Sequence, residues 1–364
     1  FQQPPLRYPA MDDNFEDDIQ IWKEAIASTK GDSAPGVDGF TFQELKMLPD
    51  QLLVPLVKII SKMDEFPQHM MLAKTSPLPK KGMLTPENSR PITILSTLYR
   101  VWGKVCTRKC LKHLNRHVSE SITGMLPQRG AHDASYMFQA MLELQRADVD
   151  HVTGLTLDLR KCFNLLSRNK VRSLMISHGL PPRLVNKWSA SLAKLCRYWD
   201  ITKTCSRIYP SNNGCPEGDS WSVVAMIVTA ETWSGLLKTE LPAPQTSAYA
   251  DNWSIWQSDQ NLESTSVLLT QKFVAWLGLE ISWEKTWIWS TSTTGATKLK
   301  EMIQHIAPVD DIKTQINATD LGCQMTYHGA AKLGILNERL TQAKARLDRL
   351  KYCSWALPLK VHMV

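Results

Sequence analysis

Apolar residues recur along most of the chain at the three- and four-residue spacing of helices that bury one face. Capping residues and runs rich in glycine and proline divide this pattern into separate segments. We predict helices at residues 12–30, 42–48, 52–63, 98–117, 132–146, 168–178, 182–195, 219–238, 261–277 and 330–351. The last of these places leucines on one stripe and basic residues largely off it, which fits either a core-facing helix or a helix lying along a nucleic-acid backbone.

Extended segments stand between these helices. Residues 72–95 contain four prolines and are expected to form strands around a loop. The apolar run 152–157 predicts a buried strand that ends at Asp158, and residues 247–255 predict a hairpin with Asp251 and Asn252 at its tip. Shorter strands are expected at 281–289 and 320–326, and one more leads into the turn at Asn213 and Gly214.

The composition is that of a packed globular protein, since 43% of the residues are hydrophobic and 21% are charged. A length of 364 residues favours two or three subdomains. The net charge of +7 permits a polyanionic partner without requiring one. The eight cysteines contain no C-x-x-C pair, which favours reduced thiols and an intracellular protein. No apolar run is long enough for a membrane span, so we expect no membrane partner.

One predicted helix carries a row of basic residues. The row recurs every four positions between residues 98 and 117 and contains no acidic residue to neutralise it. Its members are Arg100, Lys104, Arg108, Lys112 and Arg116. A solvated helix face normally mixes charges of both signs, which slightly favours contact with phosphates over an ordinary solvated face.

Two aspartates stand where a metal-dependent reaction would need them. Asp158 ends an apolar strand, and Asp251 lies between two apolar strand segments. A single aspartate at such a place is usually a turn or capping residue. Two of them brought together by neighbouring strands would form a site for Mg²⁺, which prefers carboxylate oxygens and leaves positions open for phosphates.

Several sequence blocks share their order with those of a known family. They are Pro-Leu-Pro-Lys-Lys-Gly at 77–82, Asn-Ser-Arg-Pro-Ile-Thr-Ile-Leu at 88–95, Asp158 to the Phe-Asn pair at 163–164, Gly-Cys-Pro-Glu-Gly-Asp-Ser-Trp-Ser at 214–222, Tyr-Ala-Asp-Asn at 249–252, Gly-Leu-Glu-Ile-Ser-Trp-Glu-Lys-Thr at 278–286 and Leu-Gly at 321–322. In this order they resemble the motifs of reverse transcriptases, in the style of non-LTR retrotransposon and group II intron enzymes.

The resemblance implies an α+β fold with the right-hand architecture of polymerases. Residues 1–150 would form the fingers, with a contribution from 165–212. Residues 151–329 would form the palm, an antiparallel sheet backed by helices. Residues 330–364 would begin a thumb that is cut off at the end of the chain.

The resemblance also implies RNA-templated DNA synthesis from dNTPs onto a DNA or RNA primer, in the nucleus if the host is eukaryotic. Asp158 and Asp251 would hold two Mg²⁺ (or Mn²⁺) ions with help from the carbonyl of Leu159. Lys285 would be a third catalytic residue, which protonates pyrophosphate or steadies the triphosphate; its alternative is a solvated lysine beside Glu284.

Further positions would contact the incoming nucleotide. Lys80 and Arg90 would neutralise its triphosphate, and Glu217 and Gly218 would lie beside it. Phe163 would sit under the sugar and exclude a 2′-hydroxyl, unless its role is plain core packing.

Three residues depart from the family pattern. Asn252 replaces the second aspartate of the Tyr-x-Asp-Asp tip, Glu217 replaces a glutamine, and Asn164 replaces an aspartate. These changes leave two rivals open: an RNA-dependent RNA polymerase that uses an Asp-Asn tip, and an inactive RNA-binding scaffold. From the sequence alone, an Asn252→Asp variant is expected to preserve or raise primer extension.

Overall fold

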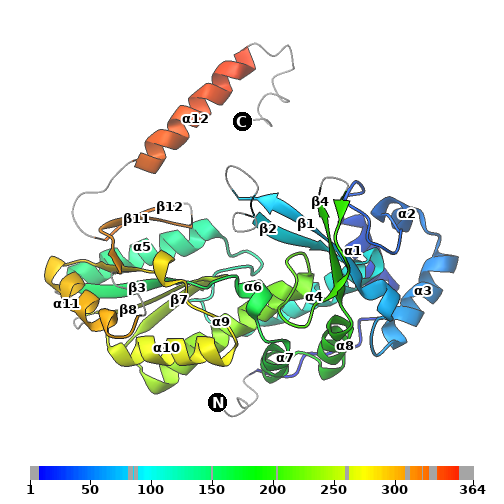
Figure 1. The fold of residues 1–364 in the computed structure, drawn as a ribbon, viewed down its shortest axis with the longest axis horizontal. Helices are drawn as coiled ribbons and strands as arrows, with labels where there is room; N and C mark the ends of the chain where they lie inside the picture. The colour runs from blue at the N-terminus through cyan, green and yellow to red at the C-terminus, as the bar shows by residue number, and fades with distance from the viewer. Residues whose placement is uncertain are drawn as a thin grey trace.

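The structure is a computed structural model that describes residues 8–80, 85, 89–148, 151–201, 204–258, 262–307, 312–321, 323–327 and 334–351. Helices pack around two larger sheets, and a small hairpin and a C-terminal helix follow (Figure 1). This is a mixed α and β structure, as expected. Some predicted positions lie outside the described residues. They are Lys81 and Gly82 of the block at 77–82, Asn88 of the block at 88–95, Gly322, and the predicted helix start at 330.

The first sheet has the strand order β2-β1-β4-β5, with β6 also paired to β4. Its strands are β1 (Leu72–Pro79), β2 (Ser89–Ile94), β4 (Cys196–Ile201), β5 (Thr204–Cys205) and β6 (Tyr209–Pro210). β1 is antiparallel to β2 from Lys74 to Pro79 and parallel to β4 from Leu72 to Thr75. Pro77 and Pro79 therefore fall beyond the pairing with β4, where their missing N–H groups cost no ladder bond.

Helices on either side of this sheet form most of the first half of the molecule. They are α1 (Ile19–Ala27), α2 (Phe42–Met47), α3 (Asp50–Lys62), the 3₁₀ turn η1 (Gln68–Met71), α4 (Thr97–His117), α7 (Arg168–Ser177) and α8 (Pro182–Ala193). The predicted start of the first helix at residue 12 is wrong. Asp18 caps α1 by accepting from the backbone N–H of Gln20, so the preceding acidic residues lie outside the helix.

The second sheet has the order β10-β9-β3-β8-β7. Its strands are β3 (Val152–Asp158), β7 (Gln245–Tyr249), β8 (Asn252–Ser258), β9 (Trp287–Ser290) and β10 (Lys313–Thr314). β3 lies at the centre, antiparallel to both β8 and β9. A side chain at Gly154 would lie within 3 Å of the Trp289 indole, so glycine lets these two strands pack closely.

Both faces of the second sheet are covered by helices. They are α5 (Ala131–Asp148) on one side, α9 (Ser220–Glu240) and α10 (Ser264–Trp276) on the other, and α11 (Thr293–Gln304) at the far end (Figure 1). β3 is buried from Val152 to Leu157, and only Asp158 at its end is partly open. The strand is thus the buried core element predicted from its sequence, and its only charged side chain, Asp158, lies at the end of the strand.

The remaining elements differ in part from the predictions. They are α6 (Cys162–Leu165), the 3₁₀ turn η2 (Trp283–Lys285), the hairpin β11 (Asn317–Asp320) and β12 (Cys323–Thr326), and α12 (Gly334–Lys351). The predicted strand at 281–289 is η2 followed by β9, and α11 was not predicted.

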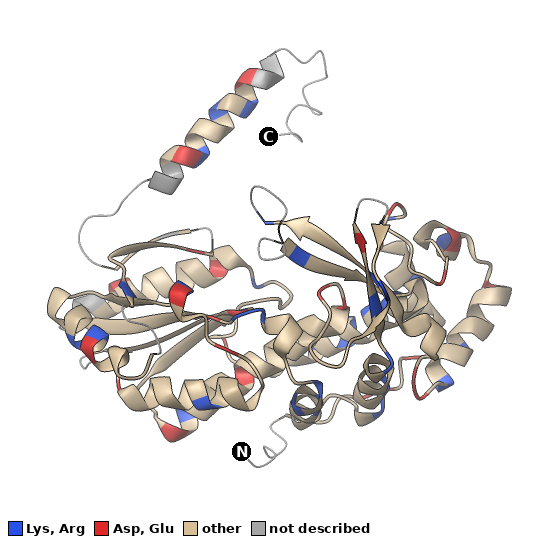
Figure 2. Ribbon diagram, in the orientation of Figure 1, with Lys and Arg blue, Asp and Glu red and all other residues tan. Residues whose placement is uncertain are grey.

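The leucine stripe of the last helix is not packed into a core. Leu340 and Leu347 on α12 are 50% and 51% exposed, so the core-facing interpretation of this stripe is wrong for these two residues. Acidic residues stand among the basic ones along α12 (Figure 2), so the helix is not uniformly positive.

Candidate active site

The register of β3 and β8 brings the two predicted metal-binding aspartates to one edge of the sheet. Asp158, the last residue of β3, pairs with Asn252, the first residue of β8. One residue further on, the backbone N–H of Leu159 donates to the carbonyl of Asp251 at 3.1 Å. The two aspartates lie 93 positions apart in the sequence (251 − 158) but become neighbours because their strands pair in this register.

The tip of the β7–β8 hairpin is one residue earlier than predicted. Tyr249 pairs with Asn252, so the turn consists of Ala250 and Asp251, and Asn252 belongs to the strand. Ala250 has φ = +54°, in the left-handed region that residues other than glycine rarely adopt. Asp251 is exposed at this tight turn, whereas Asn252 is partly buried in the sheet edge.

Asp158 lies between an acidic and a basic neighbour. The side chain is 30% exposed, and Oδ1 lies 3.3 Å from Nζ of Lys285. Burial raises the pKa of the Asp158 carboxyl, the Lys285 ammonium group lowers it, and the charge of Asp251 raises it again. A cation at this edge would interact favourably with both carboxylates. Lys285 supplies one positive charge there.

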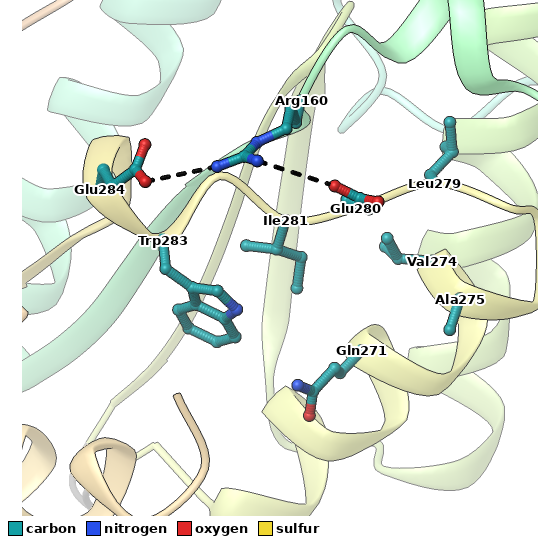
Figure 3. A pocket seen from close by; sticks show the side chains of 9 residues that line it. All are labelled: Arg160, Gln271, Val274, Ala275, Leu279, Glu280, Ile281, Trp283 and Glu284. Atoms are coloured by element: carbon teal, nitrogen blue, oxygen red, sulfur yellow. Dashed lines mark hydrogen bonds and ion pairs between the residues drawn. The ribbon is translucent and has the colours of Figure 1, made fainter. Parts of the chain in front are cut away.

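Lys285 is placed by the segment that follows α10. Arg160, two residues after Asp158, lies between two carboxylates of that segment: Nη2 is 3.3 Å from Glu284 and Nη1 is 3.9 Å from Glu280 (Figure 3). Its backbone N–H also donates to the carbonyl of Glu280 at 2.9 Å. These contacts tie the segment to the end of β3, which brings η2 and Lys285 beside Asp158. The sequence analysis did not single out Arg160.

A cavity of about 350 Å³ lies behind this ion-pair group. It is lined by Arg160, Gln271, Val274, Ala275, Leu279, Glu280, Ile281, Trp283 and Glu284 (Figure 3). Ile281 also forms a β-bridge with Leu159, so one wall of the cavity is the segment that positions Lys285.

The loop before α9 reaches β2 and α6 through two close backbone contacts. A side chain at Gly218 (φ = +119°) would lie 2.3 Å from the carbonyl oxygen of Thr93, and one at Gly214 (φ = +74°) would lie 2.3 Å from that of Asn164. The N–H of Thr93 donates to the carbonyl of Glu217 at 2.7 Å. Glycine is required at both positions because the loop is pressed against these backbones.

Two of the three residues that depart from the family pattern are partners. Nδ2 of Asn164 donates to Oε1 of Glu217 at 3.2 Å. Burial raises the pKa of Glu217, whereas this hydrogen bond and the charges of Lys80 and Arg90 lower it. The charges that lower the pKa of Glu217 are thus those of the two cations predicted to neutralise a triphosphate. Burial outweighs these groups, so the pKa of Glu217 is raised overall, and Asn164 is its hydrogen-bond partner.

Phe163 lies in α6, the short helix that follows Asp158, and its backbone contacts the loop before α9. Its ring is partly buried and packs against the main core, and its carbonyl accepts from the N–H of Cys215 at 2.6 Å. The ring therefore packs against the core with part of its surface exposed, and contact with a nucleotide sugar stays a prediction.

The first three members of the basic row on α4 face the end of α1. Nζ of Lys104 donates to Oγ1 of Thr29 at 2.7 Å, and Nη2 of Arg108 donates to Oγ of Ser28 at 2.7 Å. Arg100 donates to a backbone carbonyl in the loop after α1 at 2.7 Å. These bonds hold α4 against the C-terminal end of α1, a structural role that the sequence analysis did not foresee.

The last two members of the row, Lys112 and Arg116, are exposed. They lie one and two turns beyond the contacts with α1. Contact between the row and nucleic acid stays a prediction, and these two side chains are the ones most open to a partner.

Comparison with known proteins identifies the class. A family model described as reverse transcriptase (RNA-dependent DNA polymerase) matches residues 78–322, which is more than half of the chain. The chain belongs to this family of RNA-directed DNA polymerases, and the resemblance inferred from the motifs is confirmed.

A second comparison agrees with the resemblance to retrotransposon enzymes. Over 155 residues the chain is 24% identical to the retrovirus-related Pol polyprotein from type-2 retrotransposable element R2DM of Drosophila melanogaster. This match covers 42% of the chain and 14% of that relative. Within the described residues, none of the helices is both long and apolar enough to cross a membrane.

Proposed function

We propose that this chain synthesises DNA on an RNA template by two-metal nucleotidyl transfer from dNTPs to a primer 3′-hydroxyl. The observation that carries the proposal is the pairing of β3 with β8, which places Asp158 and Asp251 at one sheet edge in a chain of the reverse transcriptase family. The primer, the RNA template and the dNTPs are the proposed partners.

The donor groups at this edge fit Mg²⁺ or Mn²⁺. The described residues contain no cluster of three or more His, Cys, Asp or Glu side chains that could bind a metal by themselves. Two carboxylates and the carbonyl of Leu159 instead make a small set of hard oxygen donors, which suits ions that also bind substrate phosphates. When bound, such ions activate the attacking hydroxyl and stabilise the leaving group.

The residues around this edge have separate proposed tasks. Lys80 and Arg90, whose charges act on Glu217, would bind the triphosphate. Lys285 beside Asp158 would donate a proton to the leaving pyrophosphate or hold it. Phe163 would lie under the sugar.

The larger architecture follows the same proposal. The second sheet with α9, α10 and α11 would be the palm, at residues 151–329. The first sheet and the surrounding helices would be the fingers, at residues 1–150 with 165–212. The segment from 330, which includes α12, would begin the thumb.

The two rivals make different predictions. An inactive scaffold would have no need for hydrogen-bond partners at the residues that depart from the family pattern. Asn164 nevertheless donates to Glu217, and Asn252 donates to Asp320. These pairs favour a working site with changed polar partners. An RNA-dependent RNA polymerase would use NTPs, and an aromatic residue at position 163 argues against that choice.

The experiment is extension of a labelled primer on an RNA template by the purified chain. Four reactions compare dNTPs with NTPs, each with Mg²⁺ and with the metal removed by EDTA. Extension in the reaction with dNTPs and Mg²⁺, and in none of the other three, supports the proposal. Extension with NTPs alone would assign the RNA polymerase, and template binding without extension in any reaction would assign the scaffold.

A further inference from the structure

A buried arginine holds the start of the loop before α9. Arg168, the first residue of α7, is only 7% exposed. Its Nε donates to the carbonyl of Gly214 at 2.6 Å, and its Nη2 donates to the carbonyl of Asn213 and to Oγ of Ser211, each at 3.1 Å. Nη1 donates to the carbonyl of Leu192 on α8 at 2.7 Å. The guanidinium group thus joins α7 to α8 and to the start of the loop.

The same loop is bound on its other side by the chain around α6 and by β2. The N–H of Gly214 donates to the carbonyl of Leu166 at 3.2 Å, and the N–H of Cys215 donates to that of Phe163 at 2.6 Å. Further along, the carbonyl of Glu217 accepts from β2. The loop therefore runs from the segment that Arg168 holds, past α6, to β2.

A second buried arginine binds the same segment. Arg197 on β4 is 8% exposed, and its Nε donates to Oγ of Ser211 at 2.9 Å, so two guanidinium groups share one hydroxyl. Burial lowers the pKa of Arg168, the charge of Arg197 lowers it too, and the charge of Asp219 raises it. An arginine nevertheless stays protonated, and its planar fork meets several acceptors in fixed directions, which an ammonium group cannot do. Arg168 is therefore suited to fix the backbone of this loop.

We propose that Arg168 is a positioning residue for nucleotide binding: by fixing the start of the loop before α9, it sets where Glu217 and Gly218 lie relative to Phe163. The inference rests on the proposed function, in which these three residues contact the incoming nucleotide. The hydrogen bonds of Arg168 end on α8 and on this loop. A change at position 168 is therefore expected to act on nucleotide binding and much less on the metal-binding edge.

The test is single-nucleotide incorporation on a primed RNA template with the dNTP concentration varied. Arg168→Lys keeps the charge but loses the fork, so KM for the dNTP is expected to rise at least about tenfold, the size expected for one charge-assisted hydrogen bond. The kcat and the KM for primer–template should stay close to those of the wild type. Arg172→Lys is the matched control, because Arg172 lies on the same helix but donates to Asn186 on α8.

Ser211→Ala is a milder variant that removes one acceptor and leaves the three backbone carbonyls in place. It is expected to raise KM for the dNTP about threefold, near the lower end of what a hydrogen bond contributes. A purely structural role would reduce the amount of folded enzyme, which lowers the apparent kcat and leaves KM unchanged. Thermal unfolding and the burst amplitude measure that amount for each variant. If Arg168→Lys does not fold, Ser211→Ala decides the test.

Hydrogen–deuterium exchange tests the contact with the loop without any need for activity. The amides of Gly214 and Cys215 are hydrogen-bonded in the wild type, and the peptide that contains them should exchange faster in Arg168→Lys than in Arg172→Lys. Equal exchange in these two variants would overturn the inference. A wild-type KM for the dNTP in folded Arg168→Lys or in Ser211→Ala would overturn it as well.

The same measurements distinguish this failure from that of the proposed function. Wild-type chain and Asp158→Ala are measured alongside. If the wild type incorporates dNTP, Asp158→Ala does not, and Arg168→Lys matches Arg172→Lys, then only the positioning inference fails. If the wild type incorporates no nucleotide, the proposed function fails, and faster exchange in Arg168→Lys would then assign Arg168 to the structure of the loop alone.

Discussion

Nζ of Lys285 lies 3.3 Å from Oδ1 of Asp158. The two residues come from different elements, and Arg160 holds those elements together through Glu280 and Glu284. A lysine so close to the end of β3 is within reach of any phosphate bound at this edge. The contact therefore places a proton donor and a positive charge beside the proposed metal-binding carboxylate.

Replacing Lys285 tests its part in the chemistry. We expect Lys285→Ala to lower kcat for nucleotide incorporation by about 100-fold, the lower end of what general acid catalysis contributes. Lys285→Arg keeps the charge but is a poorer proton donor, so it should recover binding of the nucleotide more than kcat. Single-turnover incorporation measures both. Lys298→Ala, at an exposed lysine on α11, is the control, and a Lys285→Ala rate within threefold of it would remove Lys285 from the catalytic set.

Phe163 offers a test of sugar selection. Phe163→Val shortens a partly buried ring at the edge of the core and should open space for a 2′-hydroxyl. The ratio of dNTP to NTP incorporation is expected to fall by at least about tenfold, since a steric contact of this size is worth one to three kcal/mol. Phe40→Val, at a more exposed ring, controls for a general loss of packing. An unchanged ratio would assign Phe163 to the core alone.

The row on α4 separates into two pairs with different expected effects. Lys112→Gln with Arg116→Gln removes two exposed charges and should reduce the slope of log affinity against log salt by about one to two if both contact phosphates. Lys104→Gln with Arg108→Gln removes the bonds to α1 and should lower the melting temperature instead. Template binding at several salt concentrations measures the first effect. Equal slopes for the wild type and the Lys112/Arg116 variant would make the row an ordinary solvated face.

Asp219 predicts a dependence of stability on pH. It caps α9 in the core and accepts from Trp188, Tyr99 and the N–H of Trp221. Burial raises its pKa from 3.8 to about 6, although these hydrogen bonds lower it. The folded state thus binds this proton more tightly than the unfolded state. The stability that it contributes is present below pH 4 and is lost as the pH rises through 6.

The variant Asp219→Asn isolates this contribution, because an amide does not titrate. The wild-type free energy of unfolding, measured relative to that of Asp219→Asn, should fall by about 2 kcal/mol between pH 4 and pH 7, since each pKa unit is worth about 1.4 kcal/mol and part of the effect lies below pH 4. Urea unfolding at several pH values measures both proteins. A difference that stays constant over this range would mean that Asp219 has an ordinary pKa.

Local pattern was sufficient for much of the fold. The apolar run before Asp158 and the basic and apolar spacing of α4 predicted β3 and α4 to within a residue of their bounds. α11 was missed although Leu299, Met302 and Ile303 recur at helical spacing and pack toward the core; the glycine and threonines of its first turn are poor helix formers. The predicted strand at 281–289 was wrong at its start because Arg160 and Asp158 bind that segment as a 3₁₀ turn, which no local pattern reports.

The candidate site was predicted less completely than the fold. Family motifs pointed to Asp158 and Asp251, and the pairing of β3 with β8 then accounts for their proximity. Asn252 had looked like the loss of a carboxylate that Asn252→Asp would restore. The structure gives it a hydrogen-bond partner, Asp320, and the effect of that substitution on primer extension stays a prediction. A partner so distant in the sequence cannot be found without the tertiary structure.

The central claim is that Asp158 and Asp251 act as one unit in nucleotide transfer. The most direct measurement is single-turnover incorporation of one dNTP by Asp158→Asn, Asp251→Asn and the double variant, with Mg²⁺ and a primed RNA template. Each single variant should lose at least about a thousandfold in rate, and the double variant should be no slower than either, because residues that act as a unit are not additive. Either single variant reacting within tenfold of the wild type would contradict the account.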